Sequence, residues 1–312
     1  VCSSTATVED TVAPTAVCQD ITVQLNGNGL ASITAAQVDG GSFDNCGIAT
    51  ISVSPNSFNC SNVGANNVTL TVTDDNGNVS TCQAVVTVED TVAPIALCRN
   101  VIVPLDASGN ASITAAQVDN GSTDSCGIAS LSVSPNTFTC ADVGGNAVTL
   151  TVTDVNGNVS TCNSTATVVD NINPTAICQD LTVSLDSSGN ASISSSDIDN
   201  GSIDNCGIDS MWVLPNSFDC SDVGANAVTL TVRDVNGNLS TCNATVTVED
   251  NEVPTAICQD ITIDLDANGQ ATIAAGDVDN GSSDNCAIAS MSVSPNSFGC
   301  SNVGANSVTL TV

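Results

Sequence analysis

The sequence predicts an all-β chain, a tandem array of antiparallel β-sandwich domains with two disulfides per domain. Three observations carry this prediction. The cysteines recur every 80 residues, apolar and polar residues alternate along short segments, and turn residues separate these segments. The apolar residues show no helical periodicity, so short strands joined by turns are the expected elements.

The 80-residue period is clearest in the cysteines and in nearly copied text. "ASITAAQVD" begins at Ala31 and again at Ala111, which suggests recent duplication. The 16 cysteines fall into four series with this spacing: Cys18, Cys98, Cys178 and Cys258; Cys46, Cys126, Cys206 and Cys286; Cys60, Cys140, Cys220 and Cys300; Cys2, Cys82, Cys162 and Cys242.

This period divides the chain into repeats. Residues 1–9 match 81–89, so we expect them to be the final strand of a preceding repeat or a donor strand. The expected immunoglobulin-like repeats are 10–89, 90–169, 170–249 and 250–312, and the last lacks its final strand. A window from a longer continuous array and assembly by donor-strand exchange both fit these boundaries.

In the first half of a repeat, Ile21, Val23 and Leu25 alternate with polar neighbours and predict a half-buried strand. The Asn-Gly-Asn-Gly run at 26–29 and the Ser-Pro-Asn run at 54–56 predict turns. The residues that follow, up to Asn66, leave the number of strands open. Seven strands would place the loop at Asp44 and the later hairpin turn beside the preceding linker, whereas six would separate them.

The second half of a repeat predicts a β-hairpin. Apolar residues alternate along 68–72 and again along 82–88, and Asp-Asn-Gly-Asn at 75–78 lies between them. With one recurring Phe per repeat (Phe58 and its equivalents) the core is thin, so burial alone would leave a domain of about 80 residues marginally stable.

Cysteine therefore supplies the expected reinforcement. There is no C-x-x-C pair and no His, which argues against zinc and redox motifs and for disulfides outside a reducing cytosol. We favour Cys18 with Cys46 and Cys60 with Cys82, short loops worth roughly 3 kcal/mol each. Four cysteines allow three pairings, however, and the choice stays open. The expected disulfide cysteines are Cys18, Cys46, Cys60, Cys82, Cys98, Cys126, Cys140, Cys162, Cys178, Cys206, Cys220, Cys242, Cys258 and Cys286; Cys2 and Cys300 are left open or intermolecular.

Composition excludes several functions. The chain has 33 acidic residues but only two basic ones, Arg99 and Arg233, for a formal net charge of −31, so nucleic acid is excluded as a partner. The absence of His, Lys and Tyr removes the usual general bases and argues against an enzyme. No apolar run is long enough to cross a bilayer, so we expect no direct membrane insertion.

Three segments carry a family resemblance: "DNCGIAT" at Asp44, "DDNGNVSTC" at Asp74 and "VEDTVAP" at Val88. They resemble hyalin-repeat (HYR-type) and related immunoglobulin-like repeats of large bacterial surface proteins, once per repeat along the whole chain. The resemblance implies non-catalytic adhesive or spacer modules with a sandwich fold. One departure is that Leu70 and its equivalents stand where an aromatic residue is common in the penultimate strand.

Acidic residues gather at the ends of the repeats and predict calcium. Carboxylate and amide oxygens are the hard ligands that calcium prefers. Asp and Asn also favour turns through local hydrogen bonds, which is the alternative explanation. The expected ligands are Glu9, Asp10, Asp44, Asp74, Asn76, Glu89, Asp90, Asp124, Asp154, Asn156, Asp170, Asp204, Asp234, Asn236, Glu249, Asp250 and Asp284.

Together these patterns predict a structural stalk or filament on the bacterial cell surface, stiffened by calcium and supporting adhesion or fibre assembly. The expected partners are further copies of itself, in a continuous array or filament, and an unidentified surface or adhesive partner. The alternatives are a ligand-binding adhesin module and a pilin-like subunit that polymerises by donor-strand exchange. Near-copied loops disfavour the adhesin module, because a specific site would usually be elaborated in one repeat.

Overall fold

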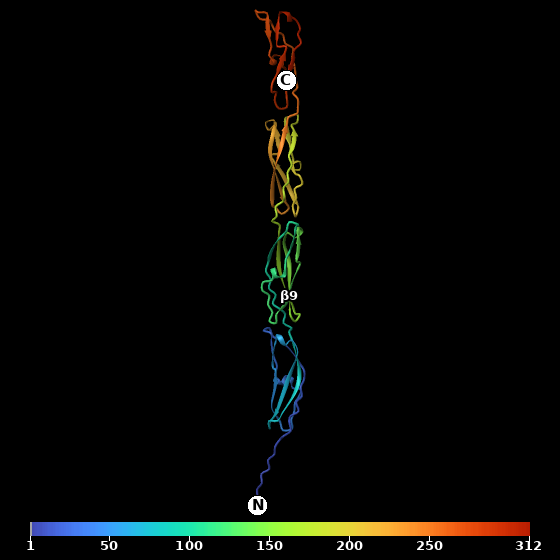
Figure 1. Cartoon of the computed structure of the whole chain (residues 1–312), viewed down its shortest axis with the longest axis vertical. Helices are drawn as coiled ribbons and strands as arrows, with labels where there is room; N and C mark the ends of the chain where they lie inside the picture. Colours follow the sequence, from blue (N-terminus) through green and yellow to red (C-terminus); the bar gives the residue numbers. More distant parts are fainter. Residues whose placement is uncertain (1) are drawn as a thin grey trace. The chain divides into compact units, whose positions relative to one another are not determined.

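The computed structural model describes residues 2–312. They form two compact units, the first made of residues up to Leu105 with Asn110–Val169, and the second of Asp106–Gly109 with Asp170–Val312. The colour bar of Figure 1 locates the residues of each unit. Each unit contains two of the 80-residue repeats, and the units are described separately below.

The first repeat shows the element order that the other repeats copy. Its elements are β1 (Ile21–Gln24), β2 (Leu30–Ser32), α1 (Ala35–Val38), β3 (Ile48–Ser54), β4 (Ser57–Asn59), the 3-10 helix η1 (Cys60–Asn62), β5 (Gly64–Asp74) and β6 (Val79–Glu89). Strands β1, β6, β5 and β3 form one sheet in that order, and β2 pairs with β4 in a second, smaller sheet. All these pairings are antiparallel except that of β1 with β6, which is parallel.

The second repeat has the same topology. It contains β7 (Val101–Pro104), β8 (Asn110–Ser112), α2 (Ala115–Val118), β9 (Ile128–Ser134), β10 (Thr137–Thr139), η2 (Cys140–Asp142), β11 (Gly144–Asp154) and β12 (Val159–Val169). The sheet order is β7-β12-β11-β9, and β9 is labelled in Figure 1.

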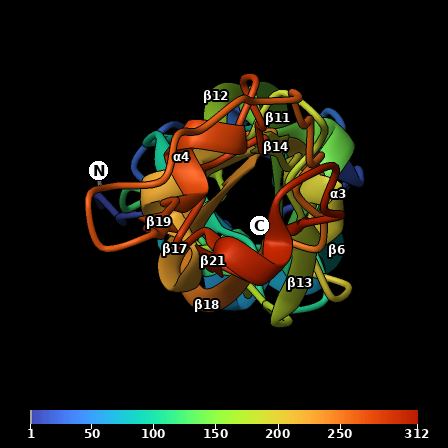
Figure 2. The ribbon, with the colours of Figure 1, turned by 90° about the horizontal axis from the view of Figure 1, so that it is seen from above.

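The second unit begins with a third complete copy: β13 (Leu181–Ser184), β14 (Asn190–Ser192), α3 (Ser195–Ile198), β15 (Ile208–Leu214), β16 (Ser217–Asp219), η3 (Cys220–Asp222), β17 (Gly224–Asp234) and β18 (Leu239–Glu249). The fourth repeat contains β19 (Gln270–Thr272), α4 (Ala275–Val278), β20 (Ser292–Ser294), β21 (Ser297–Gly299), η4 (Cys300–Asn302) and β22 (Thr309–Thr311). There β19 pairs with β21, and β20 with β22; β19, β21 and α4 are labelled in Figure 2.

The core of each complete repeat lies between its two sheets. In the first repeat, Val68, Leu70 and Val72 of β5 are buried and pack in one cluster with Phe58 of β4 and Val38 of α1. Burying a side chain of this size contributes roughly 1.5–3 kcal/mol. The alternation predicted from the sequence thus faces the core, and the predicted fold class is confirmed: the repeats are immunoglobulin-like β-sandwiches in tandem.

The short helices were not predicted. Helix α1 is a single turn, too short to show periodicity, and it begins after Thr34. The Thr34 backbone N–H donates to the Gln37 side chain at 2.7 Å, which satisfies one of the backbone donors before the turn. The Thr-x-x-Gln spacing was therefore the available signal. None of the helices within residues 2–312 has the length and apolar character needed to cross a bilayer.

The favoured disulfide pairing is wrong. Cys18 bonds Cys82 within the first repeat, and Cys60 bonds Cys126 of the next repeat in the same unit. Both pairings recur elsewhere: Cys98–Cys162, Cys178–Cys242 and Cys220–Cys286, while Cys140 and Cys206 are also disulfide-bonded.

Geometry explains the correction. Cys46 lies beside Asp10 at the linker end of its domain, whereas Cys82 lies in the middle of β6, opposite Leu70, within reach of the segment before β1. Cys46 and Cys258, which we expected in disulfides, are free thiols in the structure, as are Cys2 and Cys300.

Candidate metal centre

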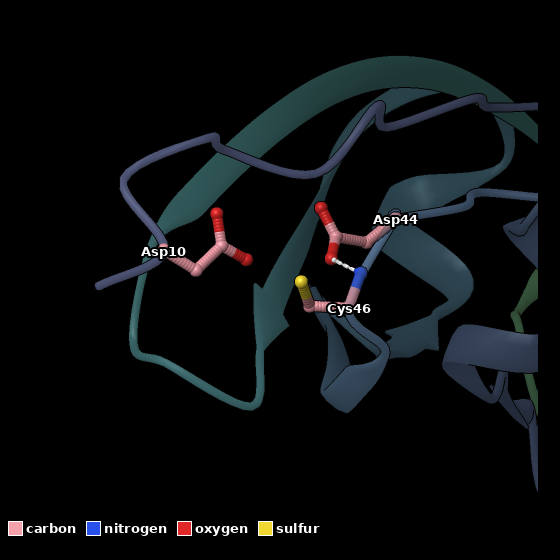
Figure 3. A group of neighbouring side chains, drawn as sticks. All are labelled: Asp10, Asp44 and Cys46. Carbon is pink, nitrogen blue, oxygen red and sulfur yellow. Dashed lines mark hydrogen bonds between the residues drawn. The ribbon is translucent and has the colours of Figure 1, made fainter. Parts of the chain in front are cut away.

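Three acidic clusters occupy equivalent places in successive repeats. We call them the first junction site (Asp10, Asp44 and Cys46), the second junction site (Asp90, Asp124 and Cys126) and the third junction site (Asp170, Asp204 and Asp234). Within each, one carboxylate oxygen or sulfur per residue lies within 4.8 Å of the others. In Figure 3 the carboxylates of Asp10 and Asp44 and the sulfur of Cys46 face a common space.

The first of the two carboxylates comes from the residue that follows the last strand of the preceding repeat. Asp90 follows β6 and is only 8% exposed. Its Oδ1 accepts a hydrogen bond from the Val92 backbone N–H at 3.1 Å, which fixes the side chain in an Asx turn. Its Oδ2 is buried without a hydrogen-bond partner, as is that of Asp10. Such an atom loses its hydration without compensation, so a ligand is expected there.

The second carboxylate comes from the loop before the third strand of each repeat. In Asp44, Oδ2 accepts the backbone N–H groups of Cys46 at 2.7 Å and Gly47 at 3.2 Å. The other oxygen, Oδ1, is buried and has no hydrogen-bond partner, and the same holds for Asp204 and Asp284. One oxygen is therefore committed to shaping the loop, and the other is available to bind a cation.

The hairpin turn lies against the same linker. Asn158, in the turn between β11 and β12, donates from Nδ2 to the backbone oxygen of Asp90 at 3.1 Å. The equivalent bond joins Asn78 to Asp10 at 3.2 Å. Both loops of a repeat thus face the preceding linker although the repeat has six strands, β1–β6, so the expectation that six strands would separate these loops is wrong.

Asp154 supports this turn. It is 1% exposed, and its carboxylate accepts from the Asn156 N–H at 2.9 Å and from the N–H and Nδ2 of Asn158, each at 2.8 Å. Burial opposes ionisation, but these hydrogen bonds, with one from Gly157, hold the pKa of Asp154 below its usual value. The pKa of Asp74 is lowered in the same way.

The thiol of the first junction site is a poor match for calcium, which prefers oxygen ligands. A hydrogen bond to Asp10, burial, and the negative charges of Asp10 and Asp44 all raise the pKa of Cys46. The thiol is therefore protonated at neutral pH, and the oxygens are the available ligands. At the second junction site the sulfur of Cys126 is in a disulfide.

No side chain neutralises these clusters. Arg99 donates from Nε to the Gln117 backbone oxygen, and Arg233 pairs with Asp209 at 3.9 Å on the surface. Two carboxylate oxygens within 4.8 Å of each other repel by at least about 3 kcal/mol at an effective dielectric constant of about 20. Calcium–oxygen distances of about 2.3–2.6 Å allow two ligands of one ion to be up to roughly 5 Å apart, so this limit and the donor set are compatible with calcium.

The predicted ligands differ in their exposure and in their hydrogen bonding. The side chains of Glu9, Glu89 and Glu249 are exposed. For Glu89 and Glu249, strand alternation buries the preceding valine and turns the glutamate outward. Asn156 has a buried, unpartnered Oδ1, whereas Asn76 and Asn236 are exposed. In the fourth repeat, Asp250 accepts from Asn285 Nδ2 at 3.1 Å, close to Asp284.

Asn285 is a further candidate ligand that was not predicted from the sequence. Its Oδ1 is buried and has no hydrogen-bond partner, so it offers one more hard ligand atom. Its position directly after Asp284 was the available signal, since Asn45 likewise follows Asp44. The sequence also gave no indication that Cys126 would belong both to a junction site and to a link between repeats.

No protein-family model matches the sequence, and no curated protein matches it. Solved structures similar to the chain are themselves tandem domains. Protocadherin gamma B7 extracellular cadherin domains 1–4 share 15% identity, with 76% of this chain and 71% of that chain covered and a TM-score of 0.28. Titin domains I67–I69 share 11%, with 77% and 100% covered and a TM-score of 0.31. Sidekick-1 immunoglobulin domains 1–4 share 10%, with 76% of each chain covered and a TM-score of 0.27. The fold assignment rests on the sheets described above.

Proposed function

We propose that this chain is a non-catalytic extracellular stalk or filament segment whose repeats are stiffened at their junctions by calcium. Its task is to hold adhesive or assembling parts at a distance, as the resemblance to hyalin-type repeats of bacterial surface proteins implies. The disulfide framework supports an oxidising location outside the cytosol. Further copies of the chain, in an array or filament, are the proposed partners.

The observation that carries this proposal is the buried, unpartnered Oδ2 of Asp90, a residue of the linker itself. Asp124 of the following repeat lies within reach of the same ion. A cation shared by the linker and the next domain would limit bending at the junction. Calcium binding and stiffness are therefore two properties of one site.

Chelation tests the proposal. With calcium, we expect a higher melting temperature than in excess chelator, because a ligand bound only by the folded state stabilises it. In excess chelator, small-angle scattering should show a wider range of molecular dimensions than with calcium, because the junctions bend more freely. The matched control is Asp264→Asn, an exposed carboxylate outside the clusters, which should respond to calcium like the parent. Asp124→Asn should reduce the calcium stoichiometry by one. Identical scattering and melting with and without calcium would refute the proposed role.

A further inference from the structure

The disulfide between repeats and the second junction site share a residue. Cys126 bonds Cys60, which begins η1 of the preceding repeat. The backbone N–H of the same Cys126 donates to Oδ2 of Asp124 at 2.7 Å, and Gly127 donates to that oxygen at 3.1 Å. The loop that presents the carboxylate is thus tied covalently to the domain before it.

The turn at Gly29 of the first repeat packs against the Cys60–Cys126 disulfide. Gly29 has a φ of +72°, and a Cβ at this position would lie 2.6 Å from the sulfur of Cys60 and 3.5 Å from that of Cys126. Glycine is required there both by the backbone conformation and by the close approach of the sulfurs. The disulfide is therefore seated between two domains, with the metal loop on one side.

The second unit repeats the arrangement. Cys220 bonds Cys286, whose backbone N–H donates to Oδ2 of Asp284 at 3.1 Å. A Cβ on Gly189 would lie 2.7 Å from the sulfur of Cys220. At the first junction site Cys46 makes the same 2.7 Å bond to Asp44 although its sulfur is a free thiol, so the disulfide adds a tether to the loop and is not needed for this hydrogen bond.

We propose that the disulfide between repeats makes the second junction site a redox-responsive calcium site. This inference rests on the proposed calcium binding. With Cys60 and Cys126 joined, the Asp124 loop is ordered before the ion arrives. A dithiol reductant gives two electrons and two protons to the S–S bond; two thiols form, the dithiol becomes a disulfide, and the loop loses its tether to the linker side. Both cysteines are partly exposed, so a small dithiol can reach them.

The expected loss of calcium affinity on reduction follows from the cost of ordering the loop. Fixing the backbone of a single residue corresponds to roughly a tenfold change in a binding constant. Because Asp124 to Gly127 must be held together for the site to form, reduction should weaken calcium binding at least tenfold. Cys60 and Cys126 act as positioning residues, since neither sulfur donates to the ion in the oxidised state.

The experiment uses the full chain with the other sites weakened by Asp44→Asn, Asp204→Asn and Asp284→Asn, so that calcium titration calorimetry reports the second junction site. To this parent is added Cys60→Ser with Cys126→Ser, which keeps the residue-126 N–H. The matched control, Cys98→Ser with Cys162→Ser, removes a disulfide inside the same repeat and leaves the link between repeats. Far-UV circular dichroism in chelator verifies that each variant is folded.

We expect the dissociation constant for calcium to rise at least tenfold in the first variant and less than threefold in the control. A dithiol should weaken binding by the parent equally and leave the Cys60/Cys126 variant unchanged. Equal affinity of the parent and this variant, or an equal loss in the control, would overturn the inference while calcium binding stands. A parent that binds no calcium even when oxidised would instead overturn the proposed function, and the inference with it.

Discussion

The disulfides within repeats remove most of each domain from the path along which a pulling force travels. Cys18 and Cys82 are 64 residues apart in sequence and directly bonded, so tension passes through the S–S bond and bypasses the loop between them. Cys98–Cys162 and Cys178–Cys242 close equivalent loops. Only 16 residues separate Cys82 from Cys98, and they carry the load between the first two loops.

The hidden length follows from these separations. Three loops of 64 residues hold 192 residues, about 650 Å of extended chain at roughly 3.4 Å per residue. From Cys18 to Cys242, the oxidised path contains two 16-residue segments, about 110 Å when extended. With all disulfides reduced, the same interval contains 224 residues, or about 760 Å. The three disulfides add Cα–Cα spans of 5.9, 6.0 and 5.9 Å to the oxidised path, so reduction should increase the maximum extension of this interval about sixfold.

Single-molecule force spectroscopy with handles attached next to Cys18 and Cys242, so that only this interval is pulled, measures this directly. The oxidised chain should lack steps longer than about 54 Å per repeat, the length of a 16-residue segment. A dithiol should introduce steps approaching 270 Å, the length of an 80-residue repeat. As a control, Cys60→Ser with Cys126→Ser should leave the oxidised extension unchanged, because the shortest path does not pass through that bond. Steps above 200 Å in the oxidised chain would refute the reasoning.

The remaining predictions concern stability and ionisation. Asp154→Asn should lower the free energy of unfolding of the second repeat by about 1–3 kcal/mol, because the amide leaves buried hydrogen-bond donors poorly matched. Urea denaturation in chelator measures this free energy. The control Asp264→Asn should change the free energy of unfolding by less than about 0.5 kcal/mol. The hydrogen bond from Ser122 lowers the pKa of Asp119, so Ser122→Ala should raise that pKa in an NMR titration. Because the folded pKa lies below the unfolded one, this aspartate stabilises the fold above about pH 4 and ceases to do so as pH falls through its folded pKa. An unshifted carboxyl resonance in the alanine variant would contradict the assigned cause.

The alternating residues of the hairpin could be read from the sequence because strand burial is a local, two-residue pattern. Leu70 and Val72 lie in the core as expected, and the turn at 75–78 joins β5 to β6. The single-turn helix at Ala35–Val38 was less accessible, since four residues carry no period and only the Thr34 and Gln37 pair marks it.

The disulfide pairing could not be derived from the sequence, and the preference for short loops led to the wrong pairing. Loop entropy describes the unfolded chain and does not indicate which sulfurs meet in the folded one. Cys60 and Cys126 meet because they lie at facing ends of successive domains, a fact that depends on the fold.

The candidate site was partly predictable, because Asp90 and Asp124 stand at positions that any sandwich places near a junction. Glu89 stays a prediction as a ligand; its side chain is exposed, because it follows the inward-facing Val88 in the strand.

The overlap of the closed loops also bears on survival among secreted peptidases. The bonds Cys18–Cys82, Cys60–Cys126 and Cys98–Cys162 overlap in sequence, so every peptide bond from residue 18 to residue 162 lies inside at least one ring. A single backbone cleavage in this stretch leaves the two fragments joined through sulfur. Even two cuts within the same ring leave the outer parts joined through its disulfide, so a nicked molecule stays covalently connected from residue 18 to residue 162.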